Sequence, residues 1–317
     1  MLRHEQLLQT LKQSSTLKHV SILFTSQYLG ALQDAARCFF SLTGFKNLTS
    51  LELYNFYGEQ DPLVLDIAGA LARCPGLRTL GLSFACDIDC DNSPEVLIFG
   101  EEMAFFEKLC VEYDAQSEAH SLRLETLRLG HGMYLCKAEY SKAEKYLAKM
   151  VNLENLRNFY IYNGLVKWDI DDPHESMKVD WDQLEDCKVL QRLSVTRLET
   201  DLVQWLKKGY GSLIEELIVT EHYGMYDEGL DNFELLRLPR LSTLFIREKT
   251  VGKRSGNNVL SNNGARLTEP GLYLDLCSVM SILDRLYDNG ARLTELGLCL
   301  DLETQWVISF TPSSCTC

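Results

Sequence analysis

The chain has 317 residues, 46% of them hydrophobic, so it is long enough to bury one large core or two smaller ones. Its 31 Lys and Arg residues against 45 Asp and Glu residues give a formal net charge of −14, which disfavours binding to the phosphate backbone of nucleic acids. The N-terminus has no apolar signal segment, and no later stretch approaches the roughly 18 consecutive apolar residues of a membrane span. We therefore expect a cytoplasmic or nuclear protein that binds neither nucleic acid nor membrane.

The eleven cysteines are odd in number and follow no framework spacing, in a chain too long to depend on disulfides for its core. Most of them are expected to act as small apolar side chains in a reducing compartment.

The first predicted element is a short amphipathic helix in residues 1–16, where Leu7, Leu8 and Leu11 share one face. From residue 17 onward, a hexad of the form L-x-x-L-x-L recurs with aliphatic or aromatic replacements at intervals of 24 to 47 residues. Its x-L-x-L alternation is typical of a strand with one buried face. The hexads begin at residues 17, 48, 77, 124, 156, 190, 214, 241, 267 and 293.

The segments between the hexads carry apolar residues at helical spacing. Several begin after Asp, Ser or Pro and end near Gly or Asn, as helices commonly do. We expect helices over residues 31–42, 62–74, 94–113, 141–153, 201–209 and 276–290.

Two segments near the C-terminus are almost the same. Residues 263–276 and 289–302 are identical at twelve of fourteen positions and begin 26 residues apart. A fixed spacing of this size indicates a repeat solenoid, so we expect the two copies to form adjacent coils. In the first copy, Pro270 lacks the amide that a strand would donate.

The ten hexads in series resemble the leucine-rich repeat family, although the asparagine or cysteine that usually follows the strand is mostly missing. The resemblance implies an α/β solenoid, or horseshoe, with a parallel sheet on the concave side and helices on the convex side. It divides the chain into a capping helix (1–16), a leucine-rich repeat domain of about ten irregular units (17–302), and a poorly structured or truncated tail (303–317).

Two insertions interrupt the repeat, at residues 85–95 and 163–188. In the first, Asp87, Asp89 and Asp91 match a calcium loop, but Asn92 replaces the required Gly and Ile98 the required Glu. Cys86 and Cys90 are not followed by a second pair of zinc ligands. The second insertion holds eight carboxylates and is either a solvated excursion or an arm for a basic partner. We expect no metal site.

No catalytic motif is complete. A phosphate-binding loop ending at Gly252-Lys253 would need Gly where Arg247 stands, and no G-x-S-x-G elbow occurs. His131 and Cys136 are the only pair suggesting a Cys/His nucleophile, and nearness in sequence says little about their geometry. We therefore expect no enzyme activity, no catalytic residue and no cofactor.

Solenoids bind partners through their extended concave surface, so the candidate binding residues are the x positions of the hexads and the residue that follows each hexad. Tyrosine, phenylalanine and arginine gather there in the middle units and are the types that dominate protein interfaces, although scattered exposed aromatics are also ordinary on a sheet. Ile218 and Phe245 are expected side by side on adjacent strands. The predicted partner-binding residues are Tyr54, Arg128, Tyr160, Tyr162, Arg192, Ile218, Phe245 and Arg247.

Among leucine-rich repeat proteins, the irregular units look most like the repeat portion of divergent fungal F-box proteins. That resemblance implies a non-enzymatic scaffold that recognises substrates for a ubiquitin ligase. The F-box itself is not seen, so a ligase adaptor would bind only a longer form of the protein. The alternative is similarity to Ran GTPase-activating proteins, whose repeats are more regular and whose acidic stretch is C-terminal. The short tail after Leu302 leads us to expect a covering chain or a longer natural protein.

Overall fold

The computed structural model describes residues 18–23, 47–56, 60–84, 105–116, 120–130, 132–133, 135, 145–162, 179–196, 198–222, 238–248, 295–299 and 305–309. Side chains are described for these residues except 56, 60–61, 221–222, 246–248, 295–299 and 305–309. The chain forms two compact units, Met1–Leu193 and Ser194–Cys317, which are taken here one at a time. The expected capping helix, the helices at 31–42 and 276–290, and the insertion at 85–95 lie outside the described residues.

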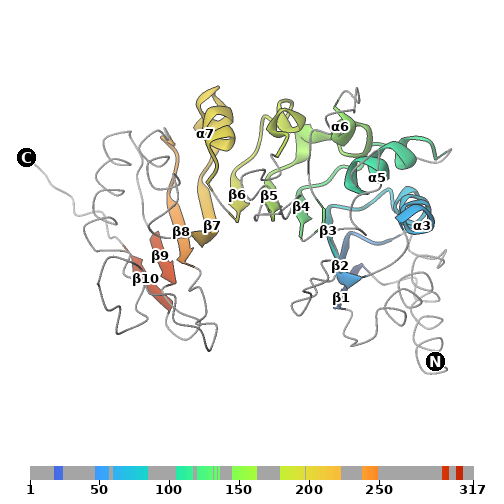
Figure 1. Cartoon of the computed structure of the whole chain (residues 1–317), viewed down its shortest axis with the longest axis horizontal. Helices are drawn as coiled ribbons and strands as arrows, with labels where there is room; N and C mark the ends of the chain where they lie inside the picture. Colours follow the sequence, from blue (N-terminus) through green and yellow to red (C-terminus); the bar gives the residue numbers. More distant parts are fainter. Residues whose placement is uncertain are drawn as a thin grey trace, which may run out of the picture. The chain divides into compact units, whose positions relative to one another are not determined.

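Parallel strands form the sheet of the first unit, and their order follows the chain (Figure 1). Each strand begins at the third residue of a hexad, as the sequence predicts. The strands are β1 (His19–Leu23), β2 (Ser50–Phe56), β3 (Thr79–Phe84), β4 (Thr126–Leu129) and β5 (Asn158–Ile161), and β6 (Arg192–Val195) begins at the end of this unit.

The apolar hexad residues form the core beneath the sheet. Leu51, Leu80, Leu127 and Phe159 lie in register on β2 to β5, and none is more than 2% exposed. The first residue of each described hexad from 48 to 241, for example Leu77, is equally buried. Residues at these positions hold the sheet against the helices because their apolar surface leaves water there.

The backbone repeats one hydrogen-bonding pattern from coil to coil. The carbonyl of the second hexad residue accepts two amides from the next coil: Lys18 O accepts from Thr49 N and Ser50 N at 2.8 and 3.0 Å. Arg78 O does the same for Glu125 N and Thr126 N at 2.7 and 3.0 Å. The repeat in sequence is therefore also a repeat in backbone geometry.

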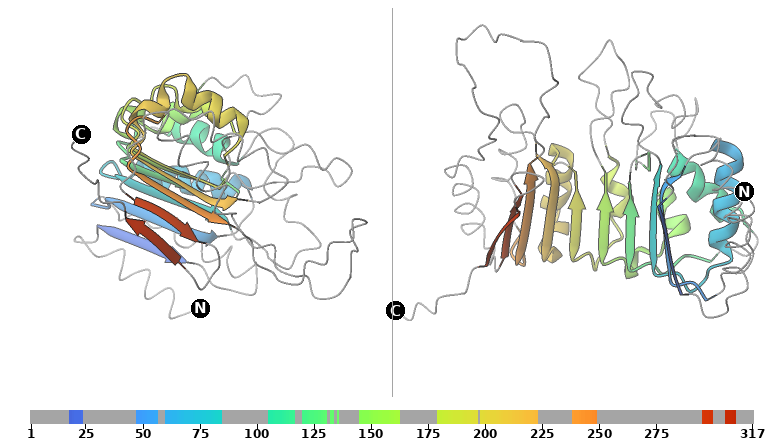
Figure 2. Two further views of the ribbon diagram at one scale, coloured as in Figure 1. Left: turned by 90° about the vertical axis from the view of Figure 1, so that its left-hand side faces the viewer. Right: turned by 90° about the horizontal axis from the view of Figure 1, so that it is seen from below.

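Helices α3 (Gln60–Ala72), α5 (Phe105–Asp114) and α6 (Tyr146–Met150) lie on one side of these strands (Figure 2). Two short 3-10 helices, η1 (Leu153–Asn155) and η2 (Trp181–Leu184), follow α6. The helix expected over 141–153 ends early, at Met150, because Met150 O accepts the amide of Leu122 at 2.8 Å. Leu122 and Val151 then form a parallel bridge, which draws the backbone out of the helix.

The second unit contains α7 (Thr200–Lys207), η3 (Tyr210–Leu213), and strands β7 (Glu216–His222), β8 (Thr243–Glu248), β9 (Glu295–Cys299) and β10 (Gln305–Ser309). Strands β7, β8 and β9 are parallel, and β10 is antiparallel to β9. The ring of Trp205 on α7 stacks on Tyr210 with centroids 4.6 Å apart. Strand β10 lies within residues 303–317, for which the sequence predicts little structure.

The prediction that the two near-identical segments form adjacent coils falls in part on residues 263–276, which lie outside the described residues. Strand β9 comes from the second copy and pairs with β8 on one side and β10 on the other.

The described architecture is thus α/β, with parallel strands alternating with helices, and it is compatible with a solenoid-like fold. In the described part of the chain, no helix combines the length and apolar character needed to cross a membrane.

Candidate partner-binding surface

The candidate site lies on the face of the first-unit sheet that points away from the helices. Burial alternates along β4 and β5: Leu127, Leu129, Phe159 and Ile161 are buried, while the residues between them are half-buried. Alternate side chains of a strand point to opposite faces, so the third and fifth hexad residues share the face opposite the core. Of the predicted residues, Tyr54, Arg128, Tyr160, Tyr162 and Arg192 belong to this unit and all are half-buried.

Five side chains of this face form a connected row that we call the Tyr54–Arg192 row: Tyr54, Glu52, Arg128, Tyr160 and Arg192. Tyr54 Oη donates to Glu52 Oε2 at 2.8 Å, and Arg128 Nη1 lies 3.7 Å from the same oxygen. The guanidinium carbon of Arg128 is 4.7 Å from the centroid of the Tyr160 ring. Arg192 Nη1 donates to Tyr160 Oη at 3.2 Å. The row therefore spans β2 to β6.

Gly81 on β3 makes this row possible. It lies in register between Glu52 on β2 and Arg128 on β4. A Cβ atom at Gly81 would lie 3.0 Å from Tyr54 Oη and 3.2 Å from Glu52 Cγ. Because Gly81 has no side chain, the β2 residues extend across β3 and reach Arg128. Gly inside a strand often marks such a close approach.

A second glycine, Gly130, enlarges the part of the strand face that carries no large side chain. A Cβ atom at Gly130, two residues after Arg128, would collide with the side chain of Ser83 on the neighbouring strand. Gly130 N also donates to Leu82 O at 2.8 Å, which keeps the two strands together beyond the end of β4. The small residues Gly130 and Ser83 therefore lie beside Arg128 on the sheet.

The charges of the row are stabilised by its own contacts. Burial opposes the charge of the Arg128 guanidinium, but the hydrogen bond with Tyr54 and the nearby Glu52 outweigh it, so the pKa of Arg128 is raised. Burial, followed by the hydrogen bond to Glu52, raises the pKa of Tyr54. At neutral pH, Tyr54 is therefore a neutral donor and Arg128 a permanent cation. Arg128 Nε is buried without a hydrogen-bond partner.

The remaining predicted residues belong to the second unit. Ile218 on β7 and Phe245 on β8 are paired in register, which confirms that they lie on adjacent strands, and both side chains are half-buried. The side chain of Arg247 lies outside the described residues.

Sequence reasoning missed Glu52 as a site residue and gave Gly81 no role. Both occupy the same hexad position as Arg128 and Tyr160. A glycine inside an otherwise regular strand was the available signal.

Metal-ligating and thiol side chains were the other candidates for chemistry. Within them, no group of three or more His, Cys, Asp or Glu side chains could hold a metal ion. Burial raises the pKa of Cys74 to about 11 and that of Cys187 to about 12, so both thiols stay protonated at neutral pH. His131, Cys136 and residues 163–178 of the acidic insertion lie outside the described residues.

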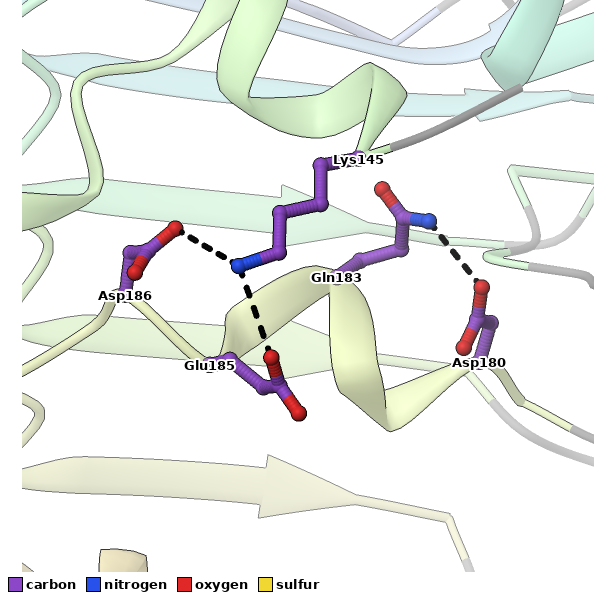
Figure 3. Close-up of polar contacts among 5 residues, drawn as sticks. All are labelled: Lys145, Asp180, Gln183, Glu185 and Asp186. Carbon is purple, nitrogen blue, oxygen red and sulfur yellow. Dashed lines mark hydrogen bonds and ion pairs between the residues drawn. The ribbon is translucent and has the colours of Figure 1, made fainter.

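On the helix side, Gln183 of η2 joins two consecutive coils through Leu147, and Figure 3 shows its other contact, with Asp180. The side chain is buried, its Oε1 accepts from Leu147 N of α6 at 3.2 Å, and its Nε2 donates to Asp180 Oδ2 at 3.0 Å. At the start of α6, exposed Lys145 lies 3.4 Å from Glu185 and 3.0 Å from Asp186. The hydrogen bond from Leu147 N to Gln183 and the ion pairs of Lys145 join the coils that carry Tyr160 and Arg192.

We expect Gln183→Met to lower the free energy of unfolding by about 1–3 kcal/mol, because methionine has a similar shape but leaves the buried Leu147 amide without an acceptor. The matched change Lys145→Met removes only exposed ion pairs and should cost less than about 1 kcal/mol. Urea unfolding followed by circular dichroism measures both. Equal losses of unfolding free energy in the two variants would show that the hydrogen bond from Leu147 N to Gln183 does not stabilise the fold.

Comparisons with models of protein families and with curated proteins found no match for this chain.

Proposed function

We propose that this protein is a non-enzymatic recognition scaffold that binds a partner protein on the strand face of its first unit. The observation that carries the proposal is the Tyr54–Arg192 row, which links two tyrosines and two arginines across β2 to β6. Tyrosine and arginine are enriched among the residues that dominate binding energy at protein interfaces.

The contacts within the row also support binding because they hold its side chains in place before a partner arrives. Arg128 rests on the Tyr160 ring, and Tyr160 accepts a hydrogen bond from Arg192. Ordering a long side chain at an interface costs about 0.5–1.5 kcal/mol, and a side chain that is already ordered avoids part of that cost. A surface of this kind can therefore bind with less entropic loss than loose arginines would.

The finer assignment, as the substrate-recognition part of an F-box-type ubiquitin ligase receptor, rests on the sequence resemblance. It needs an F-box on a longer form of the chain to reach the ligase adaptor. A Ran-GAP-like regulator of a small GTPase is the alternative and would use the same strand face for docking. GTP hydrolysis by a small GTPase, measured with and without this protein, separates the two.

The proposal is tested by affinity purification of the tagged full chain from its native cell extract, followed by mass spectrometry. The double variant Tyr54→Ala/Tyr160→Ala is expected to lose the partner that the unmodified chain retains. Leu65→Ala is the matched control, because Leu65 is 51% exposed on helix α3 and the change removes apolar surface from the other side. Circular dichroism checks that all three proteins fold.

Retention of the same partners by the double variant would overturn the assignment of this face. Recovery of a small GTPase would favour the alternative over the F-box assignment.

A further inference from the structure

We infer that the partner presents an acidic peptide segment whose carboxylates bind Arg128 and Arg192. This inference rests on the proposed recognition function and names the chemistry of the partner. Its basis is the charge, the exposure and the placement of the two guanidinium groups in the Tyr54–Arg192 row.

The row carries a charge opposite in sign to that of the chain. It contains two arginines and one glutamate, whereas the whole chain has a net charge of −14. The side chain of Glu52 is only 19% exposed and accepts a hydrogen bond from Tyr54, while that of Arg128 is 41% exposed. Arg128 is therefore more exposed than the carboxylate beside it, and a negatively charged segment complements it.

Both guanidinium groups converge on one tyrosine. Arg128 lies over the face of the Tyr160 ring and Arg192 donates to its hydroxyl. The two arginines come from β4 and β6, on either side of the strand that carries Tyr160. Carboxylates are the preferred partners of such planar donor groups, which bind them through two parallel hydrogen bonds.

The surface beside Arg128 leaves room for the main chain of a bound peptide to lie against the sheet. Gly81 and Gly130 add no side chains to the surface beside it. An extended peptide presents every second side chain on the same face, roughly 7 Å apart, so two carboxylates at alternate positions can face the two arginines beside Tyr160. We therefore expect acidic side chains at spaced positions of an extended segment.

A nucleic acid fits this surface less well than an acidic peptide. Nucleic acids gain affinity by neutralising several phosphates with as many Lys or Arg residues. Among the described residues that occupy the third and fifth hexad positions of β1 to β6, Arg128 and Arg192 are the only Lys or Arg. Two cations suffice for two carboxylates of a peptide, but the net charge of −14 would repel a polyanion.

The test begins with a phage library of random peptides of about twelve residues, selected on the immobilised full chain. We expect the bound peptides to be enriched in Asp and Glu. For a synthetic peptide from this set, Arg128→Gln/Arg192→Gln should weaken binding by about tenfold or more, or about 1.4 kcal/mol. Arg128→Lys should weaken it less, because lysine keeps the charge but loses the planar fork.

The matched control is Lys149→Gln/Lys188→Gln, which removes the same charge from two exposed residues outside the strands. It should change the affinity less than about twofold, since only long-range electrostatics are affected. Replacing the Asp and Glu of the synthetic peptide by Asn and Gln should abolish the difference between the arginine variant and the unmodified chain.

The alternatives give different results. One result is a set of selected peptides that contain no excess of Asp and Glu and yet lose binding to the Tyr54→Ala/Tyr160→Ala variant. That result would overturn the assignment of an acidic partner and leave the recognition function standing. Peptides that bind every variant equally would overturn both. Two further results would overturn the carboxylate assignment. One is tighter binding of a phosphoserine peptide than of the same peptide with glutamate in place of phosphoserine. The other is binding of a single-stranded oligothymidine that depends on the two arginines.

Discussion

Leu80→Ala is expected to lower the free energy of unfolding by about 2–5 kcal/mol, because it removes buried methyl groups from a site that cannot collapse fully. Leu80 is completely buried on β3 and lies in register between Leu51 and Leu127. It is thus in the middle of the apolar ladder that holds the first unit together. Urea unfolding followed by circular dichroism gives the loss directly.

The adjacent change Thr79→Ala is the control for this prediction. Thr79 is half-buried on the opposite face of the same strand, and its replacement should cost less than about 1 kcal/mol. A shift of the strand by one residue would exchange the two faces. Equal losses for the two variants, or a larger loss for Thr79→Ala, would therefore contradict the register described for β3.

Gly81→Val is expected to break the Tyr54–Arg192 row while the fold remains. A Cβ atom alone would lie 3.0 Å from Tyr54 Oη, so the larger valine side chain must displace Tyr54 and Glu52. Arg128 would then lose its carboxylate neighbour. If the strand face binds the partner as proposed, the affinity should fall by about tenfold or more.

The displacement has a signature that does not depend on any partner. Burial and the hydrogen bond to Glu52 raise the pKa of Tyr54. Both causes weaken when Tyr54 is pushed into solvent, so Gly81→Val should lower this pKa toward the ordinary tyrosine value of about 10. NMR titration of tyrosines labelled at Cζ measures it, with Tyr54→Phe identifying the signal.

Glu52→Gln is the companion variant, because it removes the negative charge without adding bulk. It should also lower the pKa of Tyr54, since an anion beside a phenol disfavours the phenolate. A pKa that stays unchanged in Gly81→Val, with folding intact, would mean that β3 leaves room for a side chain at this position and that the row does not depend on the glycine.

The hexads were sufficient to predict strands β1 to β9, and the buried face of those whose side chains are described, whereas β10 lies outside any hexad. Strands β1 to β9 all begin at the third residue of a hexad, and the apolar residues of the described hexads form the core. This works because alternation of apolar and polar residues is a local property, which decides the burial of a strand before its neighbours are known. The position of Tyr160 and Arg128 on the outer face followed from the same alternation.

Features that depend on contacts between distant segments were not predictable in this way. Helix α6 ends at Met150 because Leu122, almost thirty residues earlier, takes the backbone into a bridge. Local helical periodicity contains no information about that partner. The helix predicted to continue to residue 153 was therefore too long.

The sequence by itself determined the α/β repeat, the position of its strands and the types of side chain on the strand face, because each follows from apolar periodicity within one coil. Only the tertiary structure decided that Glu52 and Tyr54 reach Arg128 across Gly81, and that β9 pairs with β8 and with the antiparallel strand β10. These depend on which strands become neighbours, and the free energy of that choice comes from packing between coils.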